Sequence, residues 1–161
     1  MTSEPTLALH PANLSDLPQI NQVIALAVMQ WDLPERVKRL SLPSYQYHEQ
    51  DLRHLQITLA EYQTGHPIGI AAWEEADQAD LPAGKRGLLL HGIYVHPAYQ
   101  HRGIGSRLLD AARLAASETG LDGVLVKAQA EARGFFLACG MESLAVVDTA
   151  RDYPYRYWLA V

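Results

Sequence analysis

The stretch from Val95 to Ser106 has the residue types and spacing for anion chemistry, because Gly103 and Gly105 stand directly ahead of a helical pattern. The first amide groups of a helix have no intrahelical partner and lie at the positive end of its dipole. Glycine has no Cβ, so a phosphate can approach such a backbone closely. Arg102 and Arg107 add positive charge in an otherwise acidic chain. The spacing predicts a phosphate or pyrophosphate cradle; the alternative is an ordinary strand-to-helix turn.

The glycine turn does not fit two common nucleotide motifs. No Gly-Lys-Ser/Thr follows it, as a Walker loop requires, and Leu108 occupies the third glycine position of the dinucleotide fingerprint. The turn also comes after several strands of antiparallel type rather than in a leading βαβ unit. A nucleotide-binding protein that uses the same turn stays open as a rival function.

A histidine in the apolar segment ahead of this turn is the candidate catalytic base. His91 lies two residues before Ile93, and alternation along a strand places both side chains on one face. An imidazole titrates near neutral pH, so it could take a proton from an ammonium group. The alternative for His91 is a histidine held in the core by a backbone partner.

The composition predicts one folded domain over residues 1–161. Apolar residues make up 48% of the chain and charged residues 19%, so the chain can bury a core and is not disordered. Thirteen Lys and Arg against 18 Asp and Glu give a net charge of −5, which argues against nucleic acid and anionic membranes as partners. The single cysteine, Cys139, excludes an intrachain disulfide and a CxxC metal site, and no metal is expected.

The N-terminal residues 1–5 show no basic stretch followed by an apolar one, so no signal peptide is expected. The apolar run from Val23 to Met29 is too short to span a bilayer. We therefore expect a cytoplasmic protein without a membrane partner.

The elements that must position these residues are a mixture of strands and helices. Strand patterns cover residues 6–10, 55–62, 67–73, 87–95, 123–128, 144–148 and 155–159. Helix patterns cover about 16–30, with a cap at Ser15 or Asp16, then 35–40, 131–138 and a long stretch from Gly103 to a stop signal at Gly120. This order predicts an α/β or α+β fold, with helices on the faces of a sheet.

Two of these segments carry further expectations. Between residues 31 and 54 the pattern is interrupted by Pro34 and Pro43, and a loop of that length is often a lid or a binding segment. The alternative is a solvated connection with packing aromatics. The nearly continuous apolar segment 87–95 is expected for a strand buried on both faces.

Two sequence blocks carry a resemblance to a known family. Residues 95–109 read Val-x-Pro-x-x-Gln-x-Arg-Gly-x-Gly-x-x-Leu-Leu, and residues 132–141 read Ala-x-x-Phe-Phe-x-x-x-Gly-Met. These blocks resemble the acetyl-coenzyme A motif and the second conserved block of the GNAT superfamily of N-acetyltransferases. The resemblance covers nearly the whole chain, because the expected element order is the GNAT order. It implies a mixed, mostly antiparallel sheet with helices on both faces, and acetyl transfer from acetyl-CoA to a primary amine.

The resemblance also implies which residues bind acetyl-CoA. The backbone at the end of the 87–95 strand would bind the pantetheine arm, the amides from His101 to Ser106 would bind the pyrophosphate, and Gln129 falls where many members carry an Asn. The strands of Ile93 and Val126 would splay apart to leave a notch for the thioester. The expected cofactor-binding residues are Ile93, Tyr94, Val95, Gln100, His101, Arg102, Gly103, Ile104, Gly105, Ser106, Gln129 and Phe136.

Phe136 departs from the family pattern, because many members carry there a Tyr whose hydroxyl protonates the departing thiolate. The expected catalytic residues are therefore His91 as the base and Tyr99 as a replacement acid, with Tyr94 or another Tyr as alternatives. A non-catalytic acyl-CoA-binding module is the alternative function that Phe136 suggests.

The acceptor is expected to be a small-molecule or peptide amine. Aromatic residues that could line its pocket, and otherwise pack in the core or on the surface, are Trp31, Tyr45, Tyr47 and His48. Glu61 and Glu74 could bind a cationic acceptor, and otherwise are solvated carboxylates. The aromatic residues between 153 and 158 look like edge-strand packing that could form a homodimer surface.

Overall fold

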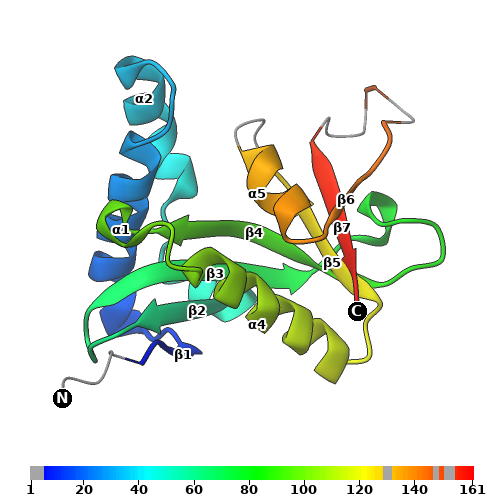
Figure 1. The fold of residues 1–161 in the computed structure, drawn as a ribbon, viewed down its shortest axis with the longest axis horizontal. Coiled ribbons are helices and arrows are strands. Elements are labelled where there is room, and N and C mark those ends of the chain that lie inside the picture. Colours follow the sequence, from blue (N-terminus) through cyan, green and yellow to red (C-terminus); the bar gives the residue numbers. More distant parts are fainter. Residues whose placement is uncertain (1–5, 129–131, 147–148, 151–154) are drawn as a thin grey trace. The chain divides into compact units, whose positions relative to one another are not determined.

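The structure is a computed structural model, and it describes residues 6–128, 132–146, 149–150 and 155–161 (Figure 1). The chain divides into two compact units. Unit 1 comprises Met1–Ala72 and Ile93–Leu108, and unit 2 comprises Trp73–Gly92 and Leu109–Val161. That residues 1–161 form a single domain stays a prediction.

The expected order of strands and helices is found along the chain. The elements are β1 (Ala8–Pro11), α1 (Leu17–Met29), α2 (Glu35–Tyr45), α3 (Asp51–His54), β2 (Gln56–Glu61), β3 (Pro67–Glu75), β4 (Gly87–Val95), α4 (Ile104–Glu118), β5 (Gly123–Lys127), α5 (Arg133–Ala138), β6 (Glu142–Ser143) and β7 (Arg156–Ala160). Short 3-10 turns are η1 (Leu14–Asp16), η2 (Gln78–Asp80) and η3 (Pro97–Tyr99).

The strands of the described residues form a seven-stranded sheet in the order β1-β2-β3-β4-β5-β7-β6. β4 and β5 pair in parallel, whereas β1 with β2, β5 with β7 and β6 with β7 pair antiparallel. The prediction of a mixed, mostly antiparallel sheet with helices is confirmed.

In unit 1, helices lie on both faces of the strands. The buried face of α1, with Ile20, Ile24 and Val28, packs on a cluster that includes Leu59 of β2 and Ile70 of β3. The neighbouring residue, Gly69, faces the other side, where a Cβ would lie 2.8 Å from Ile104 and 3.1 Å from Leu108 of α4. Because the start of α4 passes this close, only glycine fits at that position.

Asp16 is the N-cap residue of α1, within the prediction of Ser15 or Asp16, but its side chain makes no capping hydrogen bond to α1. Asn13 caps the preceding turn η1, and its side chain accepts the Ser15 N–H at 3.1 Å. The Asp16 carboxylate in turn accepts the Asn13 N–H at 2.9 Å, which completes a capping box around η1. Pro18 stands in the first turn of α1 as predicted.

The segment 31–54 is mostly helical: the helix predicted over 35–40 is found and extends to Tyr45 as α2, whereas the expectation of a long loop is wrong. α2 continues through Pro43 in its last turn, and α3 follows. Tertiary contacts hold α2: the Lys38 ammonium donates to the Met29 carbonyl at 2.8 Å, and the Tyr45 ring meets Trp31 edge to face at 5.1 Å. Such contacts offset the loss of one helical hydrogen bond at a proline, which the chain pattern alone treats as a stop.

Unit 2 is built around β5, with β4 on one side and β7 on the other. The Trp158 ring covers the paired glycines Gly87 and Gly123, where a Cβ would lie 2.8 Å and 2.5 Å from it. The expectation of a strand buried on both faces holds for Gly87, Leu88 and Leu90 but fails at His91, which is exposed.

The final strands are shifted from their predicted positions. β6 is only two residues long, at Glu142–Ser143, so the strand predicted over 144–148 is wrong where the structure describes it, up to 146. Leu144 extends the contact by one hydrogen bond, from its N–H to the Arg156 carbonyl at 2.9 Å. β7 matches its prediction within one residue at each end.

Candidate functional site

The predicted cradle is a tight turn in unit 1. His96 begins it, with its ring Nδ1 accepting the Ala98 N–H at 3.0 Å. His101 has φ +64° and Gly103 has φ +77°, so two left-handed residues stand within three positions. The left-handed region is uncommon for a side chain other than glycine, which makes His101 a strained point of the turn. A Cβ built on Gly103 meets nothing within 4 Å, so the space beside the turn is open to a ligand.

α4 begins directly after this turn. The Arg107 N–H donates to the Gly103 carbonyl at 3.1 Å, which starts the helical ladder. The amides of Ile104, Gly105 and Ser106 come before it, in the positions that have no intrahelical carbonyl. The Arg102 guanidinium lies 5.1 Å from the centre of the Tyr99 ring, in a cation–π contact. The open space, helix start and guanidinium together fit the anionic end of a ligand such as a coenzyme A.

The residues expected to bind the pantetheine arm form the end of β4. Ile93 and Val95 are half-buried and Tyr94 is buried. Tyr94 belongs to the α1 core cluster with Tyr47, and burial raises the pKa of both phenols above the ordinary tyrosine value. Past the end of β4, the His96 N–H donates to the Ile68 carbonyl at 2.7 Å.

The parallel ladder between β4 and β5 stops early. Within the described residues its register covers Gly87 to Leu90 of β4, and Leu90 pairs with Val126. His91 and Gly92, the next residues of β4 in unit 2, are outside this ladder.

His91 and Glu74 approach each other in unit 2. The His91 Nε2 atom lies 3.3 Å from the Glu74 Oε1 atom, and the side chains are 35% and 39% exposed. The alternative of a histidine satisfied in the core is therefore wrong. Beside this contact, the Arg86 guanidinium donates to the Glu75 carboxylate at 2.9 Å. Glu74 thus lies beside an imidazole and its neighbour Glu75 beside a guanidinium.

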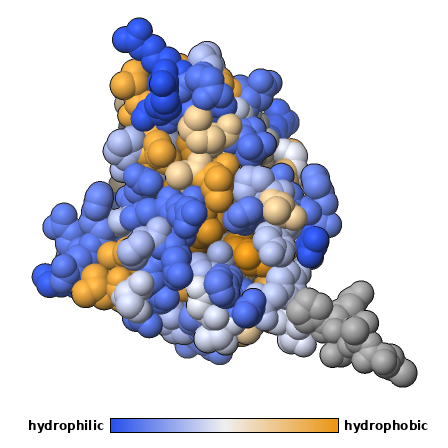
Figure 2. All heavy atoms as spheres, turned by 90° about the vertical axis from the view of Figure 1, so that its left-hand side faces the viewer, coloured by the Kyte–Doolittle hydropathy of each residue, from blue (hydrophilic) through white to orange (hydrophobic). Residues whose placement is uncertain are grey.

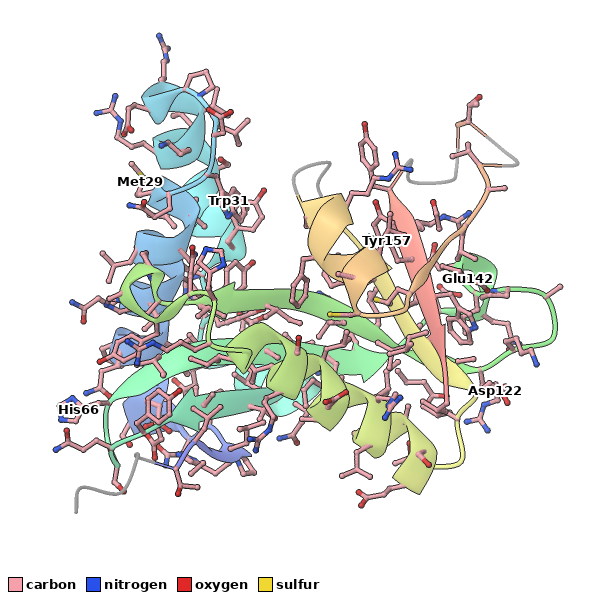
Figure 3. The ribbon with its side chains drawn as sticks, in the orientation of Figure 1. Met29, Trp31, His66, Asp122, Glu142 and Tyr157 are labelled. Carbon is pink, nitrogen blue, oxygen red and sulfur yellow. The ribbon has the colours of Figure 1, made fainter. Side chains whose placement is uncertain are left out.

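Phe136, where many GNAT members carry Tyr, is buried between two aromatic rings. It stacks on Tyr157 of β7, with ring centres 5.7 Å apart, and meets Phe135 edge to face at 5.1 Å. Figure 3 shows Tyr157 on β7 beside α5. Gln129, the other expected cofactor contact from this part of the chain, lies outside the described residues.

Comparison with known proteins decides the family. Residues 25–141, most of the chain, match the model of the acetyltransferase (GNAT) family. The chain belongs to this family. A curated relative, an uncharacterized N-acetyltransferase in the lysA 3′ region of Bacillus methanolicus, is 29% identical over 79 residues. That match covers 46% of this chain and 66% of the relative, just under two thirds of its length.

Solved structures share the GNAT fold. The PaiA N-acetyltransferase from Thermoplasma acidophilum, in complex with coenzyme A, has a TM-score of 0.78 at 13% identity and covers 97% of this chain and 99% of its own. A GNAT-family acetyltransferase from Brucella melitensis, in complex with acetyl-CoA, has a TM-score of 0.66 at 18% identity and covers 98% and 89%. At these identities the likeness shows the fold.

Tyr99, the expected replacement acid, faces a hollow in unit 1. Its ring lies 6.1 Å from that of Tyr62 and 5.5 Å from that of His96, centre to centre. The hollow has a volume of about 270 Å³ and is lined by Gln19, Gln22, Val23, Leu26, Gly65, His66, Pro67, Ile68, His96 and Tyr99. The role of Tyr99 as an acid stays a prediction.

Sequence reasoning missed this hollow. It needs α1, the β2–β3 turn and η3 to meet, and no motif marks these three segments. Figure 2 looks onto unit 1 from the side of α1 and this turn, where apolar side chains lie among hydrophilic ones. His66 projects from the turn in Figure 3.

The aromatic residues considered for the acceptor pocket are not equivalent. Trp31 and Tyr45 contact each other beside the α1 core cluster, and Tyr47 is buried in it. His48 is exposed, and its N–H donates to the Asp51 carboxylate at 2.7 Å. Trp31, Tyr45 and Tyr47 therefore contribute packing, and His48 begins the turn into α3.

Glu61 is neither solvated nor open to an acceptor. Its side chain is 7% exposed and accepts from the His10 Nε2 at 2.7 Å and from the Gly65 N–H at 3.2 Å. Of the two carboxylates considered for a cationic acceptor, Glu74 is accessible and Glu61 is not.

Within the described ranges, no group of three His, Cys, Asp or Glu side chains is placed to hold a metal ion. In the same ranges, every helix is too short or too polar to cross a membrane.

Proposed function

We propose that this GNAT chain is an acetyl-CoA-dependent N-acetyltransferase that moves the acetyl group directly to a primary amine of a small molecule or a peptide. One observation carries the proposal: a turn with left-handed His101 and Gly103 leads directly into the start of α4, in a chain of this family. Two structural neighbours were crystallised with coenzyme A or acetyl-CoA.

The same stretch of unit 1 would hold the cofactor. The amides from His101 to Ser106 receive the pyrophosphate, where the helix dipole and Arg102 favour negative charge. The backbone of Ile93, Tyr94 and Val95 receives the pantetheine arm. The notch expected for the thioester between the strands of Ile93 and Val126 stays a prediction. The role of Gln129 stays a prediction.

The transfer reaction needs few side-chain groups. An alkylammonium has a pKa of about 10, so it must lose a proton before its nitrogen can attack. His91, which is accessible, serves as the base. The amine nitrogen then bonds to the acetyl carbon, the carbon–sulfur bond breaks, and the thiolate takes a proton from the amine through water. A backbone N–H at the end of β4 polarises the thioester carbonyl, and alignment of the two reactants supplies the remaining rate acceleration.

A second candidate is an acyl-CoA-binding module without catalysis. The observation that favours it is the buried phenyl ring of Phe136, which has no hydroxyl to give a proton to the thiolate. Coenzyme A release separates the two functions. The protein is incubated with acetyl-CoA and, in turn, a polyamine, an aminoglycoside, an amino acid and a peptide N-terminus, and free thiol is followed.

Amine-dependent thiol release supports the enzyme. Calorimetric binding of acetyl-CoA with no release on any amine supports the binding module, and tighter binding of ATP or NAD than of coenzyme A overturns both. A cytoplasmic location and a homodimer stay predictions, which cell fractionation and light scattering would test.

A further inference from the structure

The turn ahead of α4 holds an arginine against an aromatic ring. The guanidinium carbon of Arg102 lies 5.1 Å from the centre of the Tyr99 ring. A cation over an aromatic ring is attracted by the negative charge of the ring face. We propose that Tyr99 is a positioning residue that holds the Arg102 guanidinium at the glycine turn, where it receives the pyrophosphate of acetyl-CoA. This inference rests on the proposed function and concerns unit 1 alone.

The Tyr99 ring is itself held by its neighbours in unit 1. The His96 ring meets it edge to face, with ring centres 5.5 Å apart, and the Tyr62 ring centre lies 6.1 Å away. The backbone is also fixed, since the Tyr99 N–H donates to the His96 carbonyl at 2.9 Å and the His96 Nδ1 accepts the Ala98 N–H at 3.0 Å. Tyr99 is half-buried, whereas Arg102 is exposed. A fixed ring therefore restrains a side chain that otherwise moves freely at the surface.

This restraint favours anion binding because a free arginine side chain has many rotamers. Ordering such a side chain on binding costs conformational entropy, and a side chain that is already ordered loses less. Arg102 directly precedes Gly103, which has φ +77°, and α4 begins at the next residue. A guanidinium held at this turn presents its N–H groups in one plane, which suits the oxygens of a pyrophosphate.

The proposed role uses the ring of Tyr99 and not its hydroxyl. It therefore differs from the role of replacement acid, in which the phenol would give a proton to the thiolate. Arg107, in the first turn of α4, provides a comparison inside the same unit. It carries the same charge as Arg102, but among the described residues no aromatic ring lies against it.

A double-mutant cycle on coenzyme A binding, measured by calorimetry, tests the pair. Tyr99→Leu should weaken binding about two- to fivefold, the range expected from an exposed cation–π contact. Arg102→Gln should weaken binding on the order of tenfold, because it removes a charged donor. In the Arg102→Gln background, Tyr99→Leu should cause no further loss, because the group that the ring positions is already absent.

Two further variants separate positioning from a general effect on the turn. Tyr99→Phe keeps the ring and should bind coenzyme A nearly as tightly as the wild type. The matched control cycle pairs Tyr99→Leu with Arg107→Gln, and the two effects should add. Equal losses from Tyr99→Leu with and without Arg102 overturn this inference alone, as does a loss in Tyr99→Phe as large as that in Tyr99→Leu. A wild-type protein that does not bind coenzyme A overturns the proposed function as well.

Proton NMR of the wild-type protein tests the contact directly, even if Tyr99→Leu does not fold. Protons over the face of an aromatic ring are shifted upfield by its ring current. The Arg102 side-chain resonances, assigned by their absence in Arg102→Gln, should therefore lie upfield of those of Arg107. They should stay upfield when coenzyme A is bound. Ordinary shifts in the free protein, or a return to ordinary shifts on binding, overturn the proposal, because the ring would then not hold the guanidinium at the ligand.

Discussion

Each unit holds a contact between an imidazole and a carboxylate, and the two contacts differ in burial. In unit 1, His10 lies 2.7 Å from Glu61, whose side chain is 7% exposed against 40% for the histidine. In unit 2, His91 lies 3.3 Å from Glu74, and both side chains are about one third exposed. The first carboxylate is part of the interior, and the second is open to solvent.

The two histidines also differ in how many nitrogens are engaged. His10 has Nδ1 at 3.0 Å from the Pro11 carbonyl and Nε2 at the Glu61 carboxylate. Only an imidazolium donates at both nitrogens, so the Pro11 hydrogen bond, followed by that to Glu61, raises the pKa of His10 above its ordinary value. Among the described residues, the His91 ring has one ion-pair contact, from Nε2 to Glu74. The same two residue types therefore make a hydrogen-bonded tie in unit 1 and an accessible contact in unit 2.

The largest effect is expected on acetyl-CoA binding, from a substitution that leaves both histidine–glutamate pairs intact. Gly105→Asp should abolish acetyl-CoA binding in a folded protein, because a carboxylate would face the pyrophosphate at a helix start that otherwise attracts it. Calorimetry measures the loss. Gly105→Ala, which adds a Cβ without charge, is the control and should lose far less affinity. Unchanged affinity in a folded Gly105→Asp variant would mean that the cradle is misplaced.

The second-largest effect is expected on kcat, and it distinguishes the His91–Glu74 pair from the His10–Glu61 pair. His91→Ala should lower kcat on the order of 10²-fold, because it removes the base from the accessible pair. Its thermal unfolding should match that of the wild type, since the side chain is exposed. If the variant instead unfolds early and keeps its rate per folded molecule, the His91 pair is structural as well, and the comparison fails.

A smaller effect is expected at Phe136, the departure from the GNAT pattern. Phe136→Tyr should raise kcat no more than about tenfold, well below the roughly 10²–10⁴-fold of a general acid. A thiol titrates near the cysteine value of about 8.5, so the thiolate can leave without full protonation. Steady-state rates on an active acceptor measure this. A gain of several hundredfold would show that proton delivery, and not the His91 base, limits the wild-type protein.

The smallest effect is expected in unit 1 and should appear only in stability. His10→Ala should reduce the free energy of unfolding by about 1 kcal/mol, because it removes one partner of the buried Glu61 carboxylate, which keeps the Gly65 N–H. The kcat should not change. Denaturant unfolding measures the loss, and His66→Ala, at an exposed histidine, is the control. A fall in kcat would show that the unit 1 pair is not purely structural.

The stability supplied by His10 should depend on pH in one direction. The folded protein holds the His10 proton more tightly than the unfolded chain does, since the pKa of His10 is raised on folding. The contribution is fully present below the ordinary pKa of about 6.5 and is lost as the pH rises through the folded-state value. The difference between wild type and His10→Ala should therefore shrink from pH 5.5 to pH 8.5. A difference that grows with pH would contradict this assignment.

Local patterns predicted most elements of the fold. β4 has its predicted bounds, and α1 and β7 lie within a residue or two of theirs. These segments carry clear apolar periodicity and stop signals such as Gly120, which adopts φ +73° just past α4. The errors fall where the decisive contact is distant. α2 continues through Pro43, and its residues Lys38 and Tyr45 contact Met29 and Trp31 outside the helix, contacts that no local pattern records.

The sequence by itself determined the glycine turn and the family, because the conformations of His101 and Gly103 and the start of α4 depend on residues adjacent in the chain. Only the tertiary structure decided which histidine has an accessible carboxylate. His91 and Glu74 come together from β4 and β3, and His10 and Glu61 from β1 and β2. Burial and the number of engaged nitrogens arise only when such distant segments pack. Residue type alone therefore could not tell a structural imidazole from one that can exchange a proton.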